Sequence, residues 1–143
     1  MVDVIDSGAV EPANSGPLPV CLLVEDEAFL ATLLEIEFSE AGFEIAGPFK
    51  RVENALAWLE HGRPHIAVID TQLEDGSSAP LARALEAKGI PFIVHSGSDP
   101  DSCGEDPTLF GTTWVTKPVL PSVVVQEAQR IIAARSFAGD AAT

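Results

Sequence analysis

Four apolar runs of this chain each lead into polar residues that carry reactive groups of three chemical kinds. The runs 20–24, 66–69, 92–94 and 114–115 lead to Glu25 and Asp26, to Asp70, to Ser96 and to Lys117. If these runs are parallel strands of one sheet, their carboxyl ends lie along a single edge, where open α/β sheets place their binding sites. The pattern therefore predicts carboxylates, a hydroxyl and an ammonium group that converge.

Strand-like and helix-like segments alternate along the chain. Apolar runs predict strands at 20–24, 43–47, 66–70, 91–95 and 113–116, and helical patterns cover 27–41, 52–61, 79–88 and 121–136. This alternation predicts an α/β fold, a doubly wound five-stranded parallel sheet with helices on both faces. Residues 97–111 contain two prolines and no helical period, so we expect the fourth helix to be missing or reduced to a turn.

The 143 residues suit one domain of ordinary size. We expect a flexible N-terminal extension over residues 1–17, the folded domain over 18–136, and a flexible C-terminal tail over 137–143. The segment 1–19 lacks the basic and apolar regions of a signal peptide, and no apolar run approaches the roughly 20 residues of a membrane span. These features predict a cytoplasmic protein.

The charge of the chain excludes some partners. It has 22 acidic and 8 basic residues and a formal net charge of −14, which disfavours nucleic acids and anionic membranes. The two cysteines, Cys21 and Cys103, make neither a disulfide framework nor a metal-binding pattern.

The predicted acidic cluster has a definite chemistry. Two carboxylates about 4 to 5 Å apart repel by roughly 3 to 4 kcal/mol at an effective dielectric constant near 20, so Glu25, Asp26 and Asp70 need a cation or a raised pKa. Oxygen ligands of this kind favour Mg²⁺. An Asp carboxylate is a nucleophile toward phosphoryl groups, and Lys117 and Ser96 offer groups that bind phosphoryl oxygens.

Each of these residues also has an ordinary structural interpretation when it is taken alone. Asp26 stands where a helix N-cap stands, and Asp70 follows a strand as turn residues do. Ser96 resembles a loop entry and Lys117 a strand exit. The order and spacing of the whole set favour a functional site.

Three motifs carry a resemblance to a known family. They are L-L-V-E-D-E at 22–27, V-I-D-T-Q-L-E-D-G at 68–76 and T-K-P at 116–118. The chain resembles the receiver domain of two-component response regulators over about residues 19–136. The resemblance implies a flavodoxin-like fold and a cis peptide bond between Lys117 and Pro118.

The resemblance also implies a role for each site residue. The implied roles are phosphorylation of Asp70, metal binding by Glu25, Asp26, Asp70 and the backbone carbonyl of Gln72, a switch formed by Ser96 and Trp114, and phosphoryl binding by Lys117. The implied cofactor is Mg²⁺. Segment 91–97 is similar to the FAT GUY receivers of alphaproteobacteria, although His95 and Ser96 replace the Ala-Thr of that pattern.

The leading hypothesis is a single-domain response regulator in two-component signalling. It would accept a phosphoryl group from a sensor histidine kinase or a histidine phosphotransfer protein, hydrolyse it slowly, and act by protein contact or as a phosphate sink. A homodimer remains open. The alternatives are a receiver-fold binding module that works without phosphorylation, and a hydrolase of the haloacid dehalogenase type. That hydrolase needs a second acid two residues after the nucleophile, where Gln72 stands.

Overall fold

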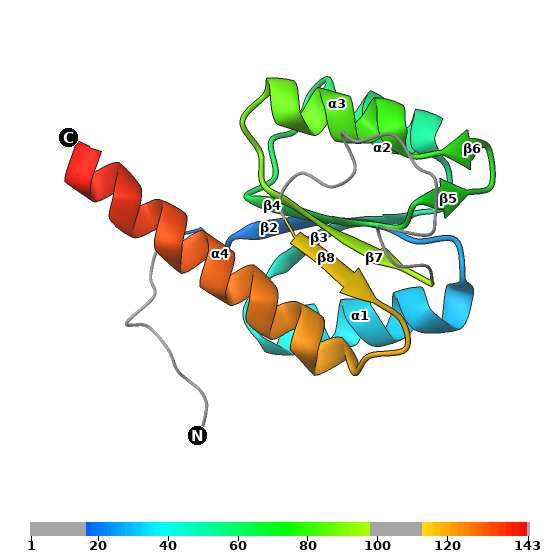
Figure 1. Cartoon of the computed structure of the whole chain (residues 1–143), viewed down its shortest axis with the longest axis horizontal. Helices are drawn as coiled ribbons and strands as arrows, with labels where there is room; N and C mark the ends of the chain where they lie inside the picture. The colour runs from blue at the N-terminus through cyan, green and yellow to red at the C-terminus, as the bar shows by residue number, and fades with distance from the viewer. Residues whose placement is uncertain (1–16, 98–112, 143) are drawn as a thin grey trace.

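The computed structural model of the chain describes residues 17–97 and 113–142, with side chains in the last helix up to Arg135. Five parallel strands form one sheet (Figure 1). Their order is β3 (Glu44–Phe49), β2 (Val20–Val24), β4 (Ile66–Ile69), β7 (Phe92–Ser96) and β8 (Thr113–Thr116). This order is the flavodoxin-like arrangement, with its switch point between β2 and β4, and it confirms the predicted fold class.

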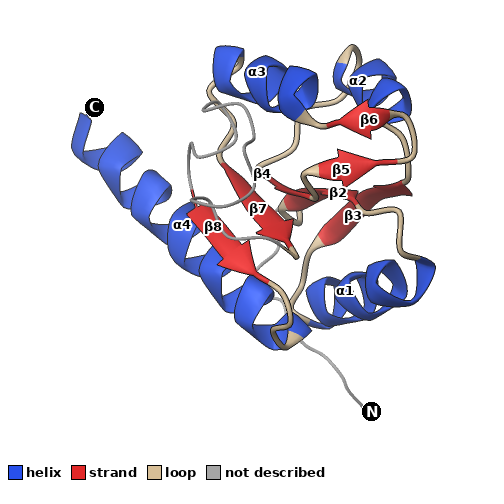
Figure 2. Ribbon diagram, turned by 45° about the vertical axis from the view of Figure 1, so that its right-hand side comes forward, coloured by secondary structure: helices blue, strands red, loops and turns tan. Residues whose placement is uncertain are grey.

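Helices cover both faces of the sheet. On one face lie α1 (Ala28–Glu40) and α4 (Pro121–Ala142), and on the other lie α2 (Val52–Leu59) and α3 (Ala79–Ala87) (Figures 1 and 2). A small antiparallel hairpin, β5 (Gln72–Leu73) and β6 (Gly76–Ser77), stands between β4 and α3. In the part of the chain described here, no helix is long and apolar enough to cross a membrane.

The hydrophobic core has two layers because successive strand residues point to opposite faces of the sheet. Leu22 and Val24 join the layer under α2 and α3, whereas Cys21 and Leu23 join the layer under α1 and α4. All four residues of β4 are buried, as expected of a central parallel strand. This buried strand holds Asp70, which follows it, at the edge of the sheet.

The edge strand β3 bends at Gly47, next to the end of β2. Gly47 has a φ of +112°, and a Cβ there would lie 2.6 Å from the carbonyl oxygen of Leu23. The pairing of β2 with β3 shifts register between Leu22 and Val24. The bend lets the backbone N–H of Glu25 donate to the carbonyl oxygen of Phe49 at 2.9 Å, which fixes the backbone at the end of β2.

Apart from shifts of one or two residues at element ends, such as β3 running to Phe49, the structure differs from the expected elements at two places. The last helix continues past Ser136 to Ala142, so the segment predicted as a tail is mostly helical. The hairpin β5–β6 was not predicted. The expected N-terminal extension and the helix-poor segment 97–111 fall almost wholly outside the described residues, and the division into residues 1–17, 18–136 and 137–143 stays a prediction.

Candidate functional site

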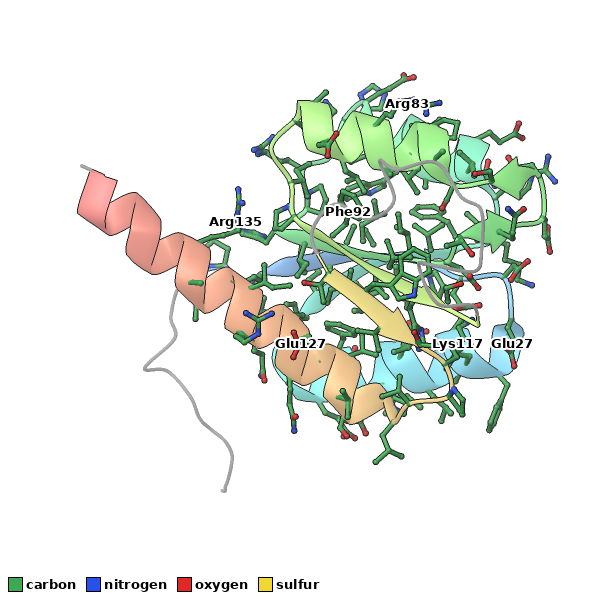
Figure 3. The ribbon with its side chains drawn as sticks, viewed as in Figure 1. Glu27, Arg83, Phe92, Lys117, Glu127 and Arg135 are labelled. Carbon is green, nitrogen blue, oxygen red and sulfur yellow. The ribbon has the colours of Figure 1, made fainter. Side chains whose placement is uncertain are left out.

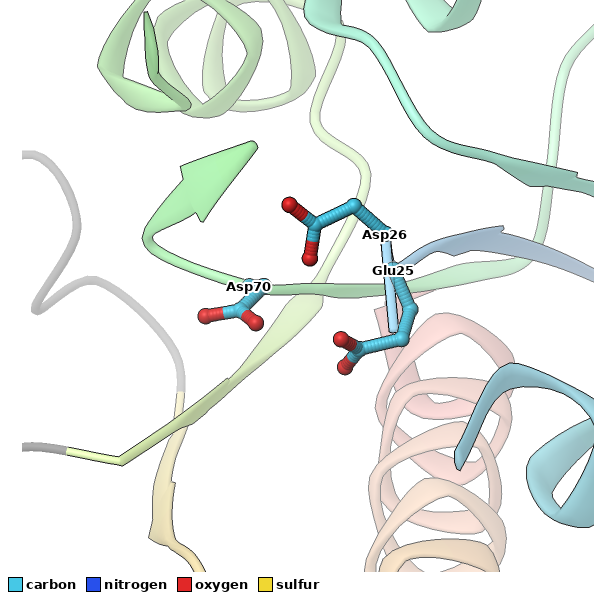
Figure 4. A group of neighbouring side chains, drawn as sticks. All are labelled: Glu25, Asp26 and Asp70. Atoms are coloured by element: carbon cyan, nitrogen blue, oxygen red, sulfur yellow. The ribbon is translucent and has the colours of Figure 1, made fainter. Parts of the chain in front are cut away.

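Three carboxylates converge at the carboxyl edge of the sheet. Glu25 and Asp26 follow β2, and Asp70 follows the neighbouring strand β4. One oxygen from each lies within 4.8 Å of one from each of the others, and Figure 4 shows the three side chains facing one another. Glu25 is buried, whereas Asp26 and Asp70 are partly exposed. The predicted acidic cluster is thus open to solvent on one side.

Lys117 reaches this cluster from the end of β8. Its Nζ lies 2.9 Å from Oδ2 of Asp70 and 3.2 Å from Oε1 of Glu25. The backbone N–H of Lys117 donates to the carbonyl oxygen of Ser96 at 2.7 Å, and the Lys117–Pro118 peptide bond is cis, as the resemblance implied. The structure therefore brings the ammonium group to two of the three acids with which the sequence grouped it.

The charges in the cluster shift one another's pKa values. Burial raises the pKa of Glu25 to about 7, and the charge of Asp70 adds to this effect although Lys117 opposes it. Burial alone would lower the pKa of Lys117, but its hydrogen bond to Asp70 and the charges of Asp70 and Glu25 outweigh burial and raise it. Lys117 is therefore a permanent cation here, while Glu25 titrates near neutral pH.

Thr71 connects Asp70 with Ser96. Its backbone N–H donates to Oδ1 of Asp70 at 2.7 Å, and its hydroxyl lies 3.0 Å from the hydroxyl of Ser96. Both hydroxyl residues are buried. Thr71 thus links the Ser96 hydroxyl to Asp70, the carboxylate that the sequence proposed as phosphoacceptor. The sequence reasoning missed Thr71 as a site residue.

The hairpin after Asp70 is held against α2. Asp75 accepts the backbone N–H groups of Val52 and Glu53 at 2.7 and 3.1 Å, and these hydrogen bonds lower its pKa, the one from Val52 most. Gln72 begins the hairpin, and its side chain is exposed. Asp75 therefore stabilises the loop that carries Gln72, a role that only its place in an Asp-Gly turn dipeptide could have suggested.

Trp114 lies apart from the acids. It pairs with Val94 across β7 and β8, is partly buried, and packs against the core layer under α2 and α3. Its switch role stays a prediction.

The donor set suits a divalent cation. Three carboxylates and one ammonium give the site a surplus of negative charge, and Glu25 is buried with a raised pKa that a bound cation would lower. All the side-chain donors are oxygens, which favours Mg²⁺ over softer metals. The cluster could hold such an ion.

Comparison with known proteins gives the fold clearly. No protein-family model matches the chain, and no curated protein matches it. Among solved structures, the signal receiver domain of a modulated diguanylate cyclase from Desulfovibrio desulfuricans is 25% identical, with a TM-score of 0.72, and the match covers 85% of this chain and 98% of that one. A CheY-like response regulator receiver domain protein from Methanospirillum hungatei is 19% identical, with a TM-score of 0.74 and coverages of 85% and 98%.

The chain has the fold of a response regulator receiver domain. The same fold is found in a streptococcal protein described as a redox sensor that evolved from two-component response regulators, at 20% identity and a TM-score of 0.76, covering 85% of this chain and 54% of that one. Receiver folds thus serve more than one purpose, so the function must be argued from the site. The FAT GUY subgroup stays a prediction.

Proposed function

We propose that the chain is a phosphoacceptor that takes a phosphoryl group onto Asp70 in the presence of Mg²⁺. The observation that carries the proposal is the contact of Lys117 with both Asp70 and Glu25 inside a cluster of three carboxylates. A purely structural acidic cluster would gain nothing from placing three repelling charges at an open edge. The donor is a phosphohistidine of a sensor histidine kinase or of a histidine phosphotransfer protein.

Each residue of the site has a task in the transfer. A carboxylate oxygen of Asp70 attacks phosphorus, the P–N bond to the donor histidine breaks, and that histidine takes up a proton. Lys117 balances negative charge on the phosphoryl oxygens, and the Ser96 hydroxyl donates to one of them once it leaves Thr71. Glu25, Asp26, Asp70 and the Gln72 carbonyl would hold Mg²⁺, which would balance negative charge on the incoming phosphoryl group.

The test uses a small-molecule phosphodonor such as acetyl phosphate and intact-mass measurement. The wild-type protein should gain one base-labile phosphoryl group with Mg²⁺ and none with EDTA, and Asp70→Asn should gain none. Glu74→Gln, which removes an exposed acid from the same loop, is the matched control and should react like the wild type. An undiminished adduct in Asp70→Asn would overturn the proposal.

A second candidate function is a receiver-fold module that binds its partner without phosphorylation. The streptococcal protein with the same fold is described as a redox sensor, a use of the fold other than two-component signalling. Under this alternative the wild-type protein stays unmodified in the phosphodonor assay with Mg²⁺, which separates the two functions in one measurement.

A further inference from the structure

We propose that a cavity beside Lys117 binds a small uncharged molecule that has an apolar body and one hydrogen-bonding group. The cavity has a volume of about 260 Å³ and lies between α1, the end of β7 and residues 117–119. Its volume is just below the range for drug-sized ligands, so it suits a fragment such as a substituted phenol. Lys117 and Glu27, two residues that line it, stand at the same end of the molecule, remote from Arg135 (Figure 3).

His95 is the observation that points to a ligand. Its side chain is 1% exposed and lines the cavity, and neither Nδ1 nor Nε2 has a hydrogen-bond partner in the described structure. A buried polar group without a partner costs roughly 1 to 3 kcal/mol, so buried groups of this kind are nearly always satisfied. A molecule in the cavity that offers a hydroxyl or amide group would satisfy the imidazole.

The side chains that line the cavity favour a ligand with an apolar body. Leu30 and Leu33 of α1 and Val119 line the cavity. Phe29, which is 73% exposed, also lines it. These side chains contact a ligand through apolar surface alone, so its affinity must come from an apolar ring or a short chain.

The charges around the cavity select a neutral head group. Burial lowers the pKa of His95 to about 4, and the nearby Lys117 adds to this effect, so the ring is uncharged at pH 7. A carboxylate in the cavity would be repelled by Glu27 and by the acid cluster, while Lys117 is already paired with Asp70 and Glu25. A cation would lie beside Lys117 and would lose its water among largely apolar walls, which costs more for a charged group than for a neutral one. A neutral hydroxyl meets neither penalty.

The test compares phenol with toluene, which has the same ring without the hydroxyl. In titrations followed by NMR, both should shift the methyl signals of Leu30, Leu33 and Val119, and phenol should bind about tenfold more tightly. In His95→Leu the two affinities should become equal within about twofold. His61→Leu, at an exposed histidine, is the matched control and should keep the wild-type preference.

The wild-type protein offers a second readout that needs no variant. Phenol should shift the ring-nitrogen signals of His95 and leave those of His61 unchanged. Absence of saturable binding, or a phenol preference that survives in His95→Leu, would overturn the proposal.

A ligand in this cavity would also affect the phosphoacceptor, because Lys117 lines the cavity and contacts Asp70. This consequence rests on the proposed function. Phenol at a concentration that saturates the wild type should change its rate of adduct formation by at least about twofold, whereas the same concentration should change the rate of His95→Leu less. The binding titration contains no phosphodonor, so failure of binding and failure of phosphorylation are separate results.

Discussion

The neighbouring strands β4 and β7 end at the same edge of the sheet, but the polar side chains at their ends differ in hydrogen bonding. At the end of β4, Oδ1 of Asp70 accepts the Thr71 backbone N–H and Oδ2 accepts the Lys117 ammonium. At the end of β7, both nitrogens of His95 are without a partner among the described residues. At the end of β4 both carboxylate oxygens of Asp70 are hydrogen-bonded, whereas at the end of β7 the imidazole nitrogens of His95 have no partner among the described residues.

This difference matters because burial penalises a polar group only when its hydrogen bonds are missing. Removing a partner at the end of β4 should therefore lower stability, whereas replacing the imidazole at the end of β7 with an apolar side chain should not lower it. The variants below test this contrast, beginning with the largest expected effect.

Lys117→Met should cause the largest loss. Without the ammonium group, the carboxylates of Glu25 and Asp70 face each other unbalanced, and breaking a buried ion pair from one side costs about 3 kcal/mol. Urea unfolding at pH 8 in EDTA measures the free energy of unfolding. Lys50→Met, at an exposed lysine, is the control and should change it little. Equal losses in both variants would contradict the importance of the buried contact.

Glu25→Gln should change how stability depends on pH. The pKa of Glu25 rises from 4.5 to about 7 on folding, so the folded protein holds this proton more tightly than the unfolded chain. Its contribution to stability is therefore full below about pH 4.5 and is lost as the pH rises through 7. In EDTA at pH 8 the variant should be more stable than the wild type, by on the order of 2 to 3 kcal/mol.

The two proteins should converge in stability near pH 5. Glu27→Gln, at the exposed neighbouring acid, should keep the wild-type pH dependence. A Glu25→Gln variant with the wild-type slope between pH 5 and 8 would show that another group titrates there.

Thr71→Val should lower the free energy of unfolding by about 1 kcal/mol, since it removes the hydroxyl that contacts Ser96. If the contact is real, the double variant with Ser96→Ala should lose less than the two single variants together. Strict additivity in urea unfolding would mean that the two hydroxyls do not interact. Thr32→Val, at an exposed threonine of α1, should change stability little.

His95→Leu should cause no loss of stability and a gain of up to about 1 kcal/mol, because it removes a buried imidazole that has no hydrogen-bond partner among the described residues. His65→Leu is the informative counterpart, since Nδ1 of His65 accepts the backbone N–H of Val20 at 2.9 Å. That variant should be the less stable of the two in thermal unfolding. The reverse order would mean that His95 has a partner.

Much of the fold could be predicted from the sequence because strand ends and helix stops are local signals. The strand β2 begins and ends where its apolar run does, and β8 covers the predicted residues 113–116. The site followed from topology, since parallel strands bring residues far apart in the chain to one edge. This is how Glu25, Asp70 and Lys117 could be grouped before any geometry was known.

Other features depend on side-chain positions that no local pattern encodes. The Thr71–Ser96 contact requires β4 and β7 to be adjacent and both hydroxyls to point inward. The cavity at His95 forms only where α1 meets residues 117–119. The end of α4 was predicted too early because the alanines after Ser136 have a high helix propensity, which outweighs Gly139.

The central claim is that Asp70 is the phosphoacceptor, and the most direct measurement identifies the modified residue. After exposure to acetyl phosphate, borohydride reduces an acyl phosphate to an alcohol, and peptide mass spectrometry locates the reduced side chain. We predict reduction at Asp70 alone, in the sample with Mg²⁺ and not in the sample with EDTA. Reduction at Glu25 or Asp26, or equal reduction at Asp70 without the metal, would contradict the account.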